Sequence, residues 1–532
     1  MFWFIRSPLL LVLALAVSSG IATAKTLVFC SEGSPEGFDP ALYTAGTTFD
    51  ASSKPVYNRL LAFRRGTTDV MLSLAESWDV SADGLVYTFN LRRHAPFHST
   101  EYFTPTRHFN ADDVIFSFER QLRKDHPWNQ YVAGTTWTSF DSLSMPDLLK
   151  AVEKIDEYTV RFVLNRPDAS MLANLAMDFA SIMSAEYAAK LAANGNKEML
   201  NILPIGTGPF EFVAYQADSV LRFAAHDGYW AGEPPIKNLV FSITTDATTR
   251  QLKLKTDQCH VAPYPNPADF EALRTDPSLQ VMEQDGLNIG YLAYNTTQSP
   301  FDRVEVRKAL NMAINKQAIV EAVFQGAGRI AKNPIPPAMW SYNDEVEDDP
   351  YNPDQAAKLL KSAGIGVLKM KIWAMPVQRA YNPNARRMAE LIQADFAKVG
   401  VEAEIVSYEW AEYLKRSKEQ DRDGAVLLGW TGGNGDPDSF LALLLGCDGV
   451  GRSNRAQWCD AEFEELIQRA KVVNSKSERT KLYEQAQTIF KREAPWATIA
   501  HSVVQLPMSK KVSGYIMDPL GGHWFDNVDL KE

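Results

Sequence analysis

The stretch that decides the fold is KMKIWAMPVQRAYNPNARRMAELIQADFAKVGVEAEIVSY, residues 369–408. It begins a run in which short apolar segments alternate with segments of helical periodicity. The run predicts, in order, strand KMKIWAM (369–375), helix NARRMAELIQADFAKVG (384–400), strand VEAEIVSY (401–408), helix WAEYLKRSKEQ (410–420) and strand GAVLLGW (424–430). This β-α-β-α-β order is typical of a parallel sheet with helices on its faces, so we expect an α/β fold.

The chain outside this stretch divides near residue 300. Before it the sequence is rich in strands, and segments 76–92 and 152–167 each predict an antiparallel hairpin around a short turn. ADDVIFSFERQL (111–122) predicts a helix with Asn110 as its N-cap. After it, VRKALNMAINKQAIVEAVFQG (306–326) predicts one helix that ends at its glycine.

The first 24 residues have the features of a cleaved secretory signal peptide. Arg6 precedes an apolar run, and the small residues Ala22 and Ala24 stand before Lys25. The apolar run is too short to span a bilayer, and no later segment approaches ~20 uninterrupted apolar residues. Cys30 follows the bulky Phe29, which is unsuited to lipid attachment. We therefore expect an exported chain without a membrane span or lipid anchor.

Charge and cysteine usage narrow the class further. The 532 residues carry a formal net charge of -11 without a block of Lys or Arg, which argues against a nucleic-acid partner. The four cysteines favour disulfides in an exported protein and allow three pairings. We prefer Cys447 with Cys459 and Cys30 with Cys259; a zinc site is the rival, but the sequence has no CxxC motif.

A candidate site lies where the predicted parallel strands end. Ligands of open parallel sheets bind outside the carboxyl ends of the strands, and three loops leave those ends, at 375–384, 409–410 and 430–438. Together they offer one guanidinium, three aromatic rings and a glycine-rich backbone: Arg379, Tyr381, Trp410, Trp430 and the segment WTGGNGDPD. A cation flanked by aromatic rings suits a ligand that carries a carboxylate and apolar side chains.

Other chemistries fit the sequence poorly. The 430–438 loop lacks the later glutamate of an EF-hand and the GxxxxGK[ST] pattern of a phosphate loop. His94 and His98 are separated by Pro96, which argues against a metal site on one helical face. No GxSxG motif marks a hydrolase nucleophile. We expect neither enzyme activity nor a metal or cofactor.

Several segments resemble the dipeptide-binding proteins of bacterial ABC importers, within the peptide and nickel class of extracytoplasmic solute-binding proteins. They are TLVFCSEGSPEGFDP (26–40), GTTFDASS (46–53), LAESWDVSADG (74–84), GTGPF (206–210), residues 374–416 and GWTGGNGDPDSF (429–440). The likeness covers Lys25 to about Asn527. It implies a two-lobed periplasmic binding protein fold of the large class, with a strand-rich subdomain inserted in lobe I. The implied division is signal peptide 1–24, lobe I 25–286, lobe II 287–502 and a C-terminal return to lobe I at 503–532.

The same resemblance implies roles for individual residues. Arg379 would bind the carboxylate of a peptide, with Tyr381 and Trp410 lining side-chain pockets, and Thr44, Ala45 and Gly46 would offer backbone groups from the opposite lobe. The family's disulfide pattern agrees with the pairing preferred above. The implied partners are a short peptide, an inner-membrane permease and a chemoreceptor, and the implied state is a periplasmic monomer.

One position departs from the family. Dipeptide binders of this class carry an aspartate for the peptide ammonium where this chain has Gly433. Leaving a buried ammonium unpaired costs about 2 to 5 kcal/mol. Three hypotheses follow: Asp436, Asp438 or Glu409 takes over the ammonium of a short peptide; or the ligand is a carboxylate without an ammonium there, such as an N-blocked or γ-linked peptide or haem; or, remotely, the chain is a secreted hydrolase.

Overall fold

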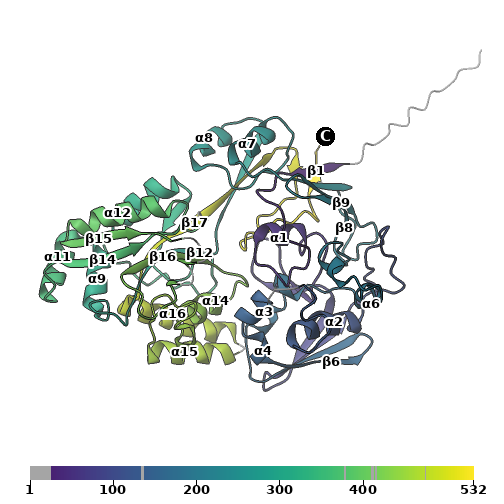
Figure 1. Ribbon diagram of the computed structural model, residues 1–532, viewed down its shortest axis with the longest axis horizontal. Coiled ribbons are helices and arrows are strands. Elements are labelled where there is room, and N and C mark those ends of the chain that lie inside the picture. The colour runs from purple at the N-terminus through teal and green to yellow at the C-terminus, as the bar shows by residue number, and fades with distance from the viewer. Residues whose placement is uncertain are drawn as a thin grey trace, which may run out of the picture.

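The computed structural model describes residues 25–132, 137–376, 379–408, 412–413, 416–473 and 475–531. The predicted signal peptide at 1–24 lies outside this range. The described residues form two masses joined by long strands (Figure 1). We call the mass that holds the first part of the chain and the C-terminal elements lobe I, and the mass that holds the parallel strands lobe II. None of the described helices is both long and apolar enough to cross a membrane.

Lobe I contains two four-stranded sheets. In the first, with order β1-β10-β9-β8, β1 runs parallel to β10 and the other pairs are antiparallel. Its strands are β1 (Thr26–Phe29), β8 (Phe210–Gln216), β9 (Val220–Ala225) and β10 (Asn238–Ser242). The second, with order β4-β5-β7-β6, is antiparallel throughout. Its strands are β4 (Ala75–Val80), β5 (Val86–Leu91), β6 (Leu149–Asp156) and β7 (Thr159–Leu164).

The second sheet confirms the hairpins predicted at 76–92 and 152–167. The helix predicted beside it is also confirmed, as α2 (Ala111–Leu122). Asn110 caps it by accepting a hydrogen bond from the Asp112 amide at 3.0 Å, and the Asp113 carboxylate accepts one from the Asn110 amide at 2.9 Å. This reciprocal arrangement satisfies amides that the first turn of a helix otherwise leaves unpaired.

Shorter elements complete this part of the chain. They are α1 (Gly46–Ala51), β2 (Leu61–Phe63), β3 (Val70–Leu72), α3 (Thr138–Ser142), α4 (Met145–Leu148), α5 (Met171–Asn174), η1 (Asp178–Ala180), α6 (Ala185–Ala193), η2 (Lys197–Asn201), α7 (Ala247–Lys255), η3 (Pro267–Asp269) and α8 (Phe270–Arg274).

Lobe II is built on a mixed sheet with order β11-β17-β12-β16-β14-β15, to which β13 adds by pairing with β17. β14 runs parallel to both β15 and β16, so the predicted parallel sheet is confirmed. The strands are β11 (Leu279–Asp285), β12 (Asn288–Tyr294), β13 (Gly328–Ile330), β14 (Leu368–Trp373), β15 (Val401–Val406), β16 (Ala425–Thr431) and β17 (Trp496–Ser509).

Helices cover both faces of the lobe II sheet. The helix predicted at 384–400 is confirmed as α12, with Asn384 as its cap. Residues 410, 411, 414 and 415 of the helix predicted at 410–420 lie outside the described residues. Of the others, 412, 413 and 416 are helical, and 417–420 are not. The helices are α9 (Val304–Ala313), α10 (Lys316–Ile319), α11 (Pro353–Ser362), α12 (Ala385–Ala397), α14 (Asp438–Leu445), α15 (Ala461–Val472) and α16 (Lys476–Glu493), with η5 (Cys447–Gly449) between α14 and α15.

The single helix predicted at 306–326 is wrong. The chain leaves helical geometry at Ile314, whose ψ is 119°, and α10 restarts after Asn315, followed by a π turn η4 (Val320–Phe324). The Asn315 side chain caps α10 by accepting a hydrogen bond from the Ala318 amide at 3.1 Å. The backbone amide of Asn315 donates to the Asp395 carboxylate at 2.9 Å. A tertiary contact and a cap therefore overrule the apolar periodicity.

The core explains how the two ends of the chain meet. In lobe I, Leu27 from the first strand packs in the same buried cluster as Leu506, Val512 and Phe525 from the C-terminal segment. That segment continues into β18 (Val512–Ser513) and β19 (Asp529–Leu530), which pair with each other. Two further clusters cover the two faces of the lobe II sheet.

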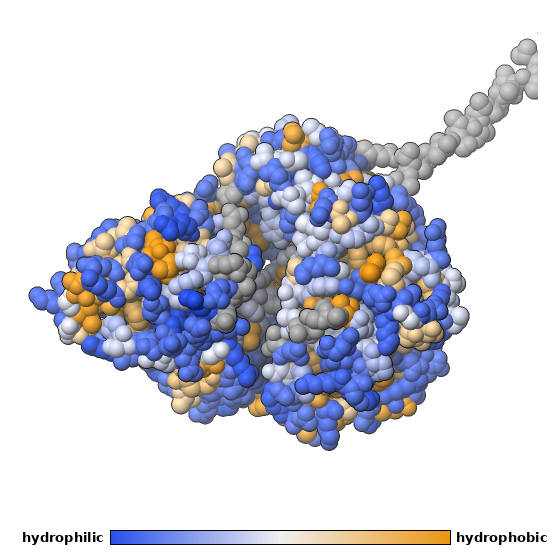
Figure 2. Space-filling model, viewed as in Figure 1, coloured by the Kyte–Doolittle hydropathy of each residue, from blue (hydrophilic) through white to orange (hydrophobic). Residues whose placement is uncertain are grey.

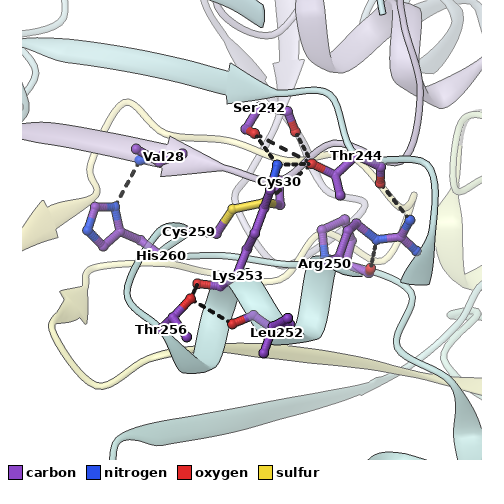
Figure 3. Close-up of a disulfide and its surroundings, with 11 residues drawn as sticks. Val28, Cys30, Ser242, Thr244, Arg250, Leu252, Lys253, Thr256, Cys259 and His260 are labelled. Atoms are coloured by element: carbon purple, nitrogen blue, oxygen red, sulfur yellow. Dashed lines mark hydrogen bonds between the residues drawn. A yellow bond between two sulfur atoms is a disulfide. The ribbon is translucent and has the colours of Figure 1, made fainter. Parts of the chain in front are cut away.

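Both preferred disulfides are confirmed: Cys30 with Cys259, and Cys447 with Cys459. Figure 3 shows the first one beneath Thr244, beside Arg250 on α7. It links the end of β1 to the segment after α7, where Val261 bridges to both Phe29 and Met508. The disulfide and these bridges thus hold together the end of β1, the segment after α7 and the end of β17.

Candidate functional site

The loop after β14 carries the predicted cation. Arg379 is exposed, and its backbone exchanges two hydrogen bonds with Asn382, with N···O distances of 3.1 and 2.9 Å. This tight turn brings Tyr381 close to the Arg379 side chain. Burial raises the pKa of the Tyr381 hydroxyl, while the nearby charge of Arg379 and a hydrogen bond from its side chain act in the opposite direction. The structure thus brings two of the predicted site residues together.

Tyr381 is 8% exposed and lies over the pairing of β12 with β16. Gly290 and Gly429 face each other across that pairing. A side chain on Gly429 would collide with the Tyr381 ring, and one on Gly290 would collide with its carbonyl. The glycine pair therefore makes the seat for the tyrosine. The sequence analysis missed both glycines, although glycine inside a strand pattern is a signal of close approach.

The aromatic residues at the strand ends are placed unequally. Trp430, the penultimate residue of β16, is half-buried, and its indole Nε1 has no hydrogen-bond partner within the described part of the chain. Trp410 and Glu409 lie outside the described residues. Trp430 therefore contributes an apolar face to the lobe II cluster that also contains Tyr381.

The glycine-rich loop after β16 is firmly held. The Gly432 amide donates to the Leu287 carbonyl at 2.8 Å, and the Asp436 amide donates to the Asn434 side chain at 3.0 Å. Arg479 on α16 donates to both carboxylate oxygens of Asp436 at 2.8 Å each. The two side chains are 8% and 7% exposed.

The predicted contact of Asp436 with the ligand stays a prediction. Both oxygens of its carboxylate are bound to a buried guanidinium, so a ligand ammonium would have to share them with Arg479. Asp436 fixes the loop against α16.

Asp438, another candidate for the ammonium, begins α14 and is half-buried. Burial raises the pKa of its carboxyl from 3.8 to about 7, with Lys471 lowering it and Asp436 and Asp168 raising it. The Lys471 ammonium lies 4.0 Å from its Oδ2, and its Oδ1 has no hydrogen-bond partner among the described atoms. Asp438 therefore sits half-buried near the lobe boundary.

Lobe I meets this loop directly. The Asn434 side chain donates to the Asn174 side chain at 2.9 Å, and the Ala169 amide donates to the Lys471 carbonyl at 2.7 Å. Gly433 is exposed, but a Cβ placed on it would lie only 2.9 Å from the Met177 methyl carbon. The described lobes are therefore in contact at one end of the hollow that Figure 2 shows between them.

On the lobe I side, residues 44–46 lead into α1. Thr44 and Gly46 are exposed, Ala45 is half-buried, and the Ala45 carbonyl accepts the Thr48 and Phe49 amides at 3.1 Å each. A Cβ on Gly46 would meet nothing within 4 Å, so its backbone faces open space. The first amides of a helix have no partner within it, so this edge can donate to a ligand.

The chain is similar in sequence and in structure to known bacterial proteins. The family model for bacterial extracellular solute-binding proteins, family 5 (middle), matches residues 69–452. The chain is 53% identical over 520 residues to the dipeptide-binding protein of Escherichia coli K12, covering 97% of each. It is 50% identical over 506 residues to heme-binding protein A of Haemophilus influenzae, covering 95% of this chain and 92% of the relative.

Two solved structures extend the likeness to three dimensions. HbpA2 from Haemophilus parasuis is 44% identical, with a TM-score of 0.91 over 95% of this chain and 100% of the other. A dipeptide-binding protein from Pseudoalteromonas in complex with Met-Leu is 38% identical, with a TM-score of 0.82 over the same shares. The resemblance noted in the sequence is confirmed: the chain belongs to the family 5 bacterial extracellular solute-binding proteins.

Proposed function

We propose that this protein captures short peptides, dipeptides above all, between its two lobes and delivers them to the permease of an ABC importer. The names of the relatives support this function, since several are called dipeptide-binding or di/tripeptide-binding proteins. It is a binding function, without a chemical step.

The observation that carries the proposal is the pairing of exposed Arg379 with Tyr381 at the carboxyl end of β14. A guanidinium binds a carboxylate through two parallel hydrogen bonds. In this proposal Arg379 takes the terminal carboxylate, while Tyr381, Trp410 and Trp430 line the apolar pockets. Backbone groups of residues 44–46 complete the site from lobe I.

Closure of the lobes supplies the mechanism. The ligand binds the lobe II loops first, lobe I closes over it, and the exclusion of water strengthens the charge-assisted hydrogen bonds. The lobes are divided at 25–286, 287–502 and 503–532, which assigns β11, the edge strand of the shared sheet, to lobe I, and the hinge lies where β11, β12 and β17 pass between the lobes. The closed monomer, in the periplasm after removal of residues 1–24, is the form that the permease and a chemoreceptor recognise.

The proposal is tested by removing one charge from each side of the contact. The chain from Lys25 is freed of bound ligand by unfolding and oxidative refolding, and binding of a dipeptide and of its C-terminal amide is measured by calorimetry. We expect the amide, or the variant Arg379→Gln, to weaken binding by roughly thirty- to several-thousand-fold, because each leaves a buried charge unpaired.

Arg386→Gln is the matched control, because Arg386 is an exposed arginine on α12 whose charge pairs with Glu390. The affinity of Arg386→Gln for the dipeptide should equal that of the wild type. Equal binding of the dipeptide and its amide would contradict the role of Arg379, and no binding of any short peptide would contradict the function.

A second candidate is a carboxylate ligand without an ammonium at the 430–438 loop, such as an N-blocked or γ-linked peptide like glutathione, or haem. The observation that favours it is the commitment of Asp436 to Arg479 next to Gly433, which offers no carboxylate. A thermal-shift screen with free peptides, N-acetylated peptides, glutathione and haem separates the two candidates.

A further inference from the structure

A buried hydrogen bond between two asparagines joins the lobes at the loop after β16. The Asn434 side chain of lobe II donates to the Asn174 side-chain carbonyl of lobe I at 2.9 Å, and the two residues are 3% and 2% exposed. Asn174 ends α5, and Asn434 follows Gly433 in the glycine-rich loop. We call Asn174 and Asn434 the interlobe pair. Both side chains are hydrated when the lobes are apart, so closure exchanges bonds to water for this bond.

The interlobe pair lies in the middle of a chain of hydrogen bonds that all run in one direction. On lobe II, the Asp436 backbone amide donates to Asn434 Oδ1 at 3.0 Å. On lobe I, Asn174 Nδ2 donates to Ser170 Oγ at 3.3 Å, and the Ser170 hydroxyl donates to Asp168 Oδ1. A backbone amide can only donate and a carboxylate accepts, so the two ends fix the orientation of both asparagine side chains. Bonds in such a chain strengthen one another.

The same segment of lobe I makes a second contact with lobe II. The Ala169 backbone amide donates to the carbonyl of Lys471, near the end of α15, at 2.7 Å. An ion pair between Asp69 and Lys476, 3.8 Å apart, also crosses between the lobes, but its side chains are 62% and 63% exposed. Because exposed ion pairs contribute little free energy, we expect the buried asparagines to contribute more to closure than this pair does.

We propose that Asn174 is a positioning residue for ligand binding: on closure it accepts the Asn434 side chain and holds the 432–438 loop in place without touching the ligand. The proposal rests on the binding function proposed above and adds to it a determinant of affinity that is the same for every ligand. The interlobe pair forms only when the lobes meet, so its free energy adds to that of closure and raises the population of the closed form. Every ligand that binds the closed form gains the same factor, whatever its side chains.

The test measures dissociation constants and dissociation rates on the refolded chain from Lys25, with Met-Leu, Ala-Phe and N-acetyl-Met-Leu as ligands. For Asn174→Ala we expect each ligand that binds the wild type to bind about five- to 150-fold more weakly, by one common factor, because closure then buries the Asn434 side chain without its acceptor. The loss should appear as faster dissociation, since the pair forms after the ligand has bound lobe II. Asn434→Ala should give the same result from the other lobe, and the double variant should lose less than the product of the two factors.

Two variants serve as controls. Asn129→Ala removes another buried asparagine of lobe I, whose side chain donates to the Arg120 carbonyl of the same lobe at 2.9 Å. This variant should lower the free energy of unfolding and leave the affinities unchanged, because its lost bond is present in the open and the closed form alike. Lys476→Gln removes the exposed ion pair between the lobes and should weaken binding by less than about fivefold.

The outcomes separate this inference from the function on which it rests. Unchanged affinities in Asn174→Ala and Asn434→Ala overturn the inference and leave peptide binding intact. Losses that differ by more than about threefold between ligands also overturn it, because the pair would then contact the ligand, and so do losses that simply multiply in the double variant. If none of the three peptides binds the wild type, the peptide function fails, and the same comparison is made with glutathione and haem, for which the common factor is still expected. Binding of neither overturns both proposals.

Discussion

Replacing Arg479 with methionine should lower the free energy of unfolding by more than the loss of an exposed ion pair does. The Arg479 guanidinium donates to both oxygens of Asp436, and also to the Ala470 carbonyl at 3.0 Å and the Tyr483 hydroxyl at 2.9 Å. Both charged side chains are less than a tenth exposed. Arg479→Met leaves the buried Asp436 carboxylate without its partner, which costs about 3 to 5 kcal/mol.

The magnitude is measured with a double-mutant cycle on the ligand-free protein, using urea unfolding followed by tryptophan fluorescence. We expect Asp436→Asn to cost a similar amount, and the double variant to lose clearly less than the sum, because no unpaired charge remains. The control cycle uses Lys154 and Asp112, which lie 2.7 Å apart but are 40% and 50% exposed. Their coupling should stay below about 1 kcal/mol.

The reasoning fails if the two substitutions at 436 and 479 are additive within about 0.5 kcal/mol, because that is the behaviour of independent sites. A second readout follows the loop itself. Hydrogen exchange at residues 432–438 should speed up in Arg479→Met, since the side chain that fixes the loop to α16 is lost.

Three further outcomes are expected. Because burial raises the pKa of Asp438 to about 7, folding takes up a proton between about pH 4 and 7, and the contribution of this group to stability falls as pH rises through that window. Asp438→Asn should flatten that part of the pH profile of urea unfolding and stabilise the protein above about pH 7. An unchanged profile would contradict the raised pKa of Asp438. Removing Cys447 and Cys459 together by serine substitution should cost about 3 kcal/mol in the same unfolding assay, since the bridge closes a loop with a sequence separation of 12; a loss below about 1 kcal/mol would show that the chain-entropy argument does not apply. Small-angle scattering should show a smaller radius of gyration on addition of a bound peptide, and an unchanged radius would rule out lobe closure.

The regular elements could be predicted because local sequence determines them. The hairpins at 76–92 and 152–167 follow from period-two alternation around short turns, and α12 from its cap at Asn384 and its apolar stripe. The break in the helix predicted at 306–326 could not be predicted in this way. It depends on the contact between the Asn315 amide and Asp395, which are 80 residues apart.

The residues of the candidate site likewise fall into those that the sequence can predict and those that it cannot. Arg379, Tyr381 and Trp430 could be proposed as site residues from the sequence because strand order alone predicts that they lie at one sheet edge. The commitment of Asp436 to Arg479 and the approach of Met177 to Gly433 could not be found, because each depends on how separate segments pack. Periodicity carries no information about such pairs, whose partners are chosen by tertiary structure.

The 14-residue strand β17 has a consequence for how the chain is made. Its first half pairs with β12 in lobe II, its second half pairs with β11, and the residues after it supply Val512 and Phe525 to the core around Leu27. Lobe I therefore cannot finish its core until almost the whole polypeptide has emerged, although its first strand is synthesised at the start. Until then the N-terminal half keeps apolar surface exposed. The lobes therefore cannot fold one after the other in the order of synthesis. A partner that shields the nascent N-terminal half has time to bind it.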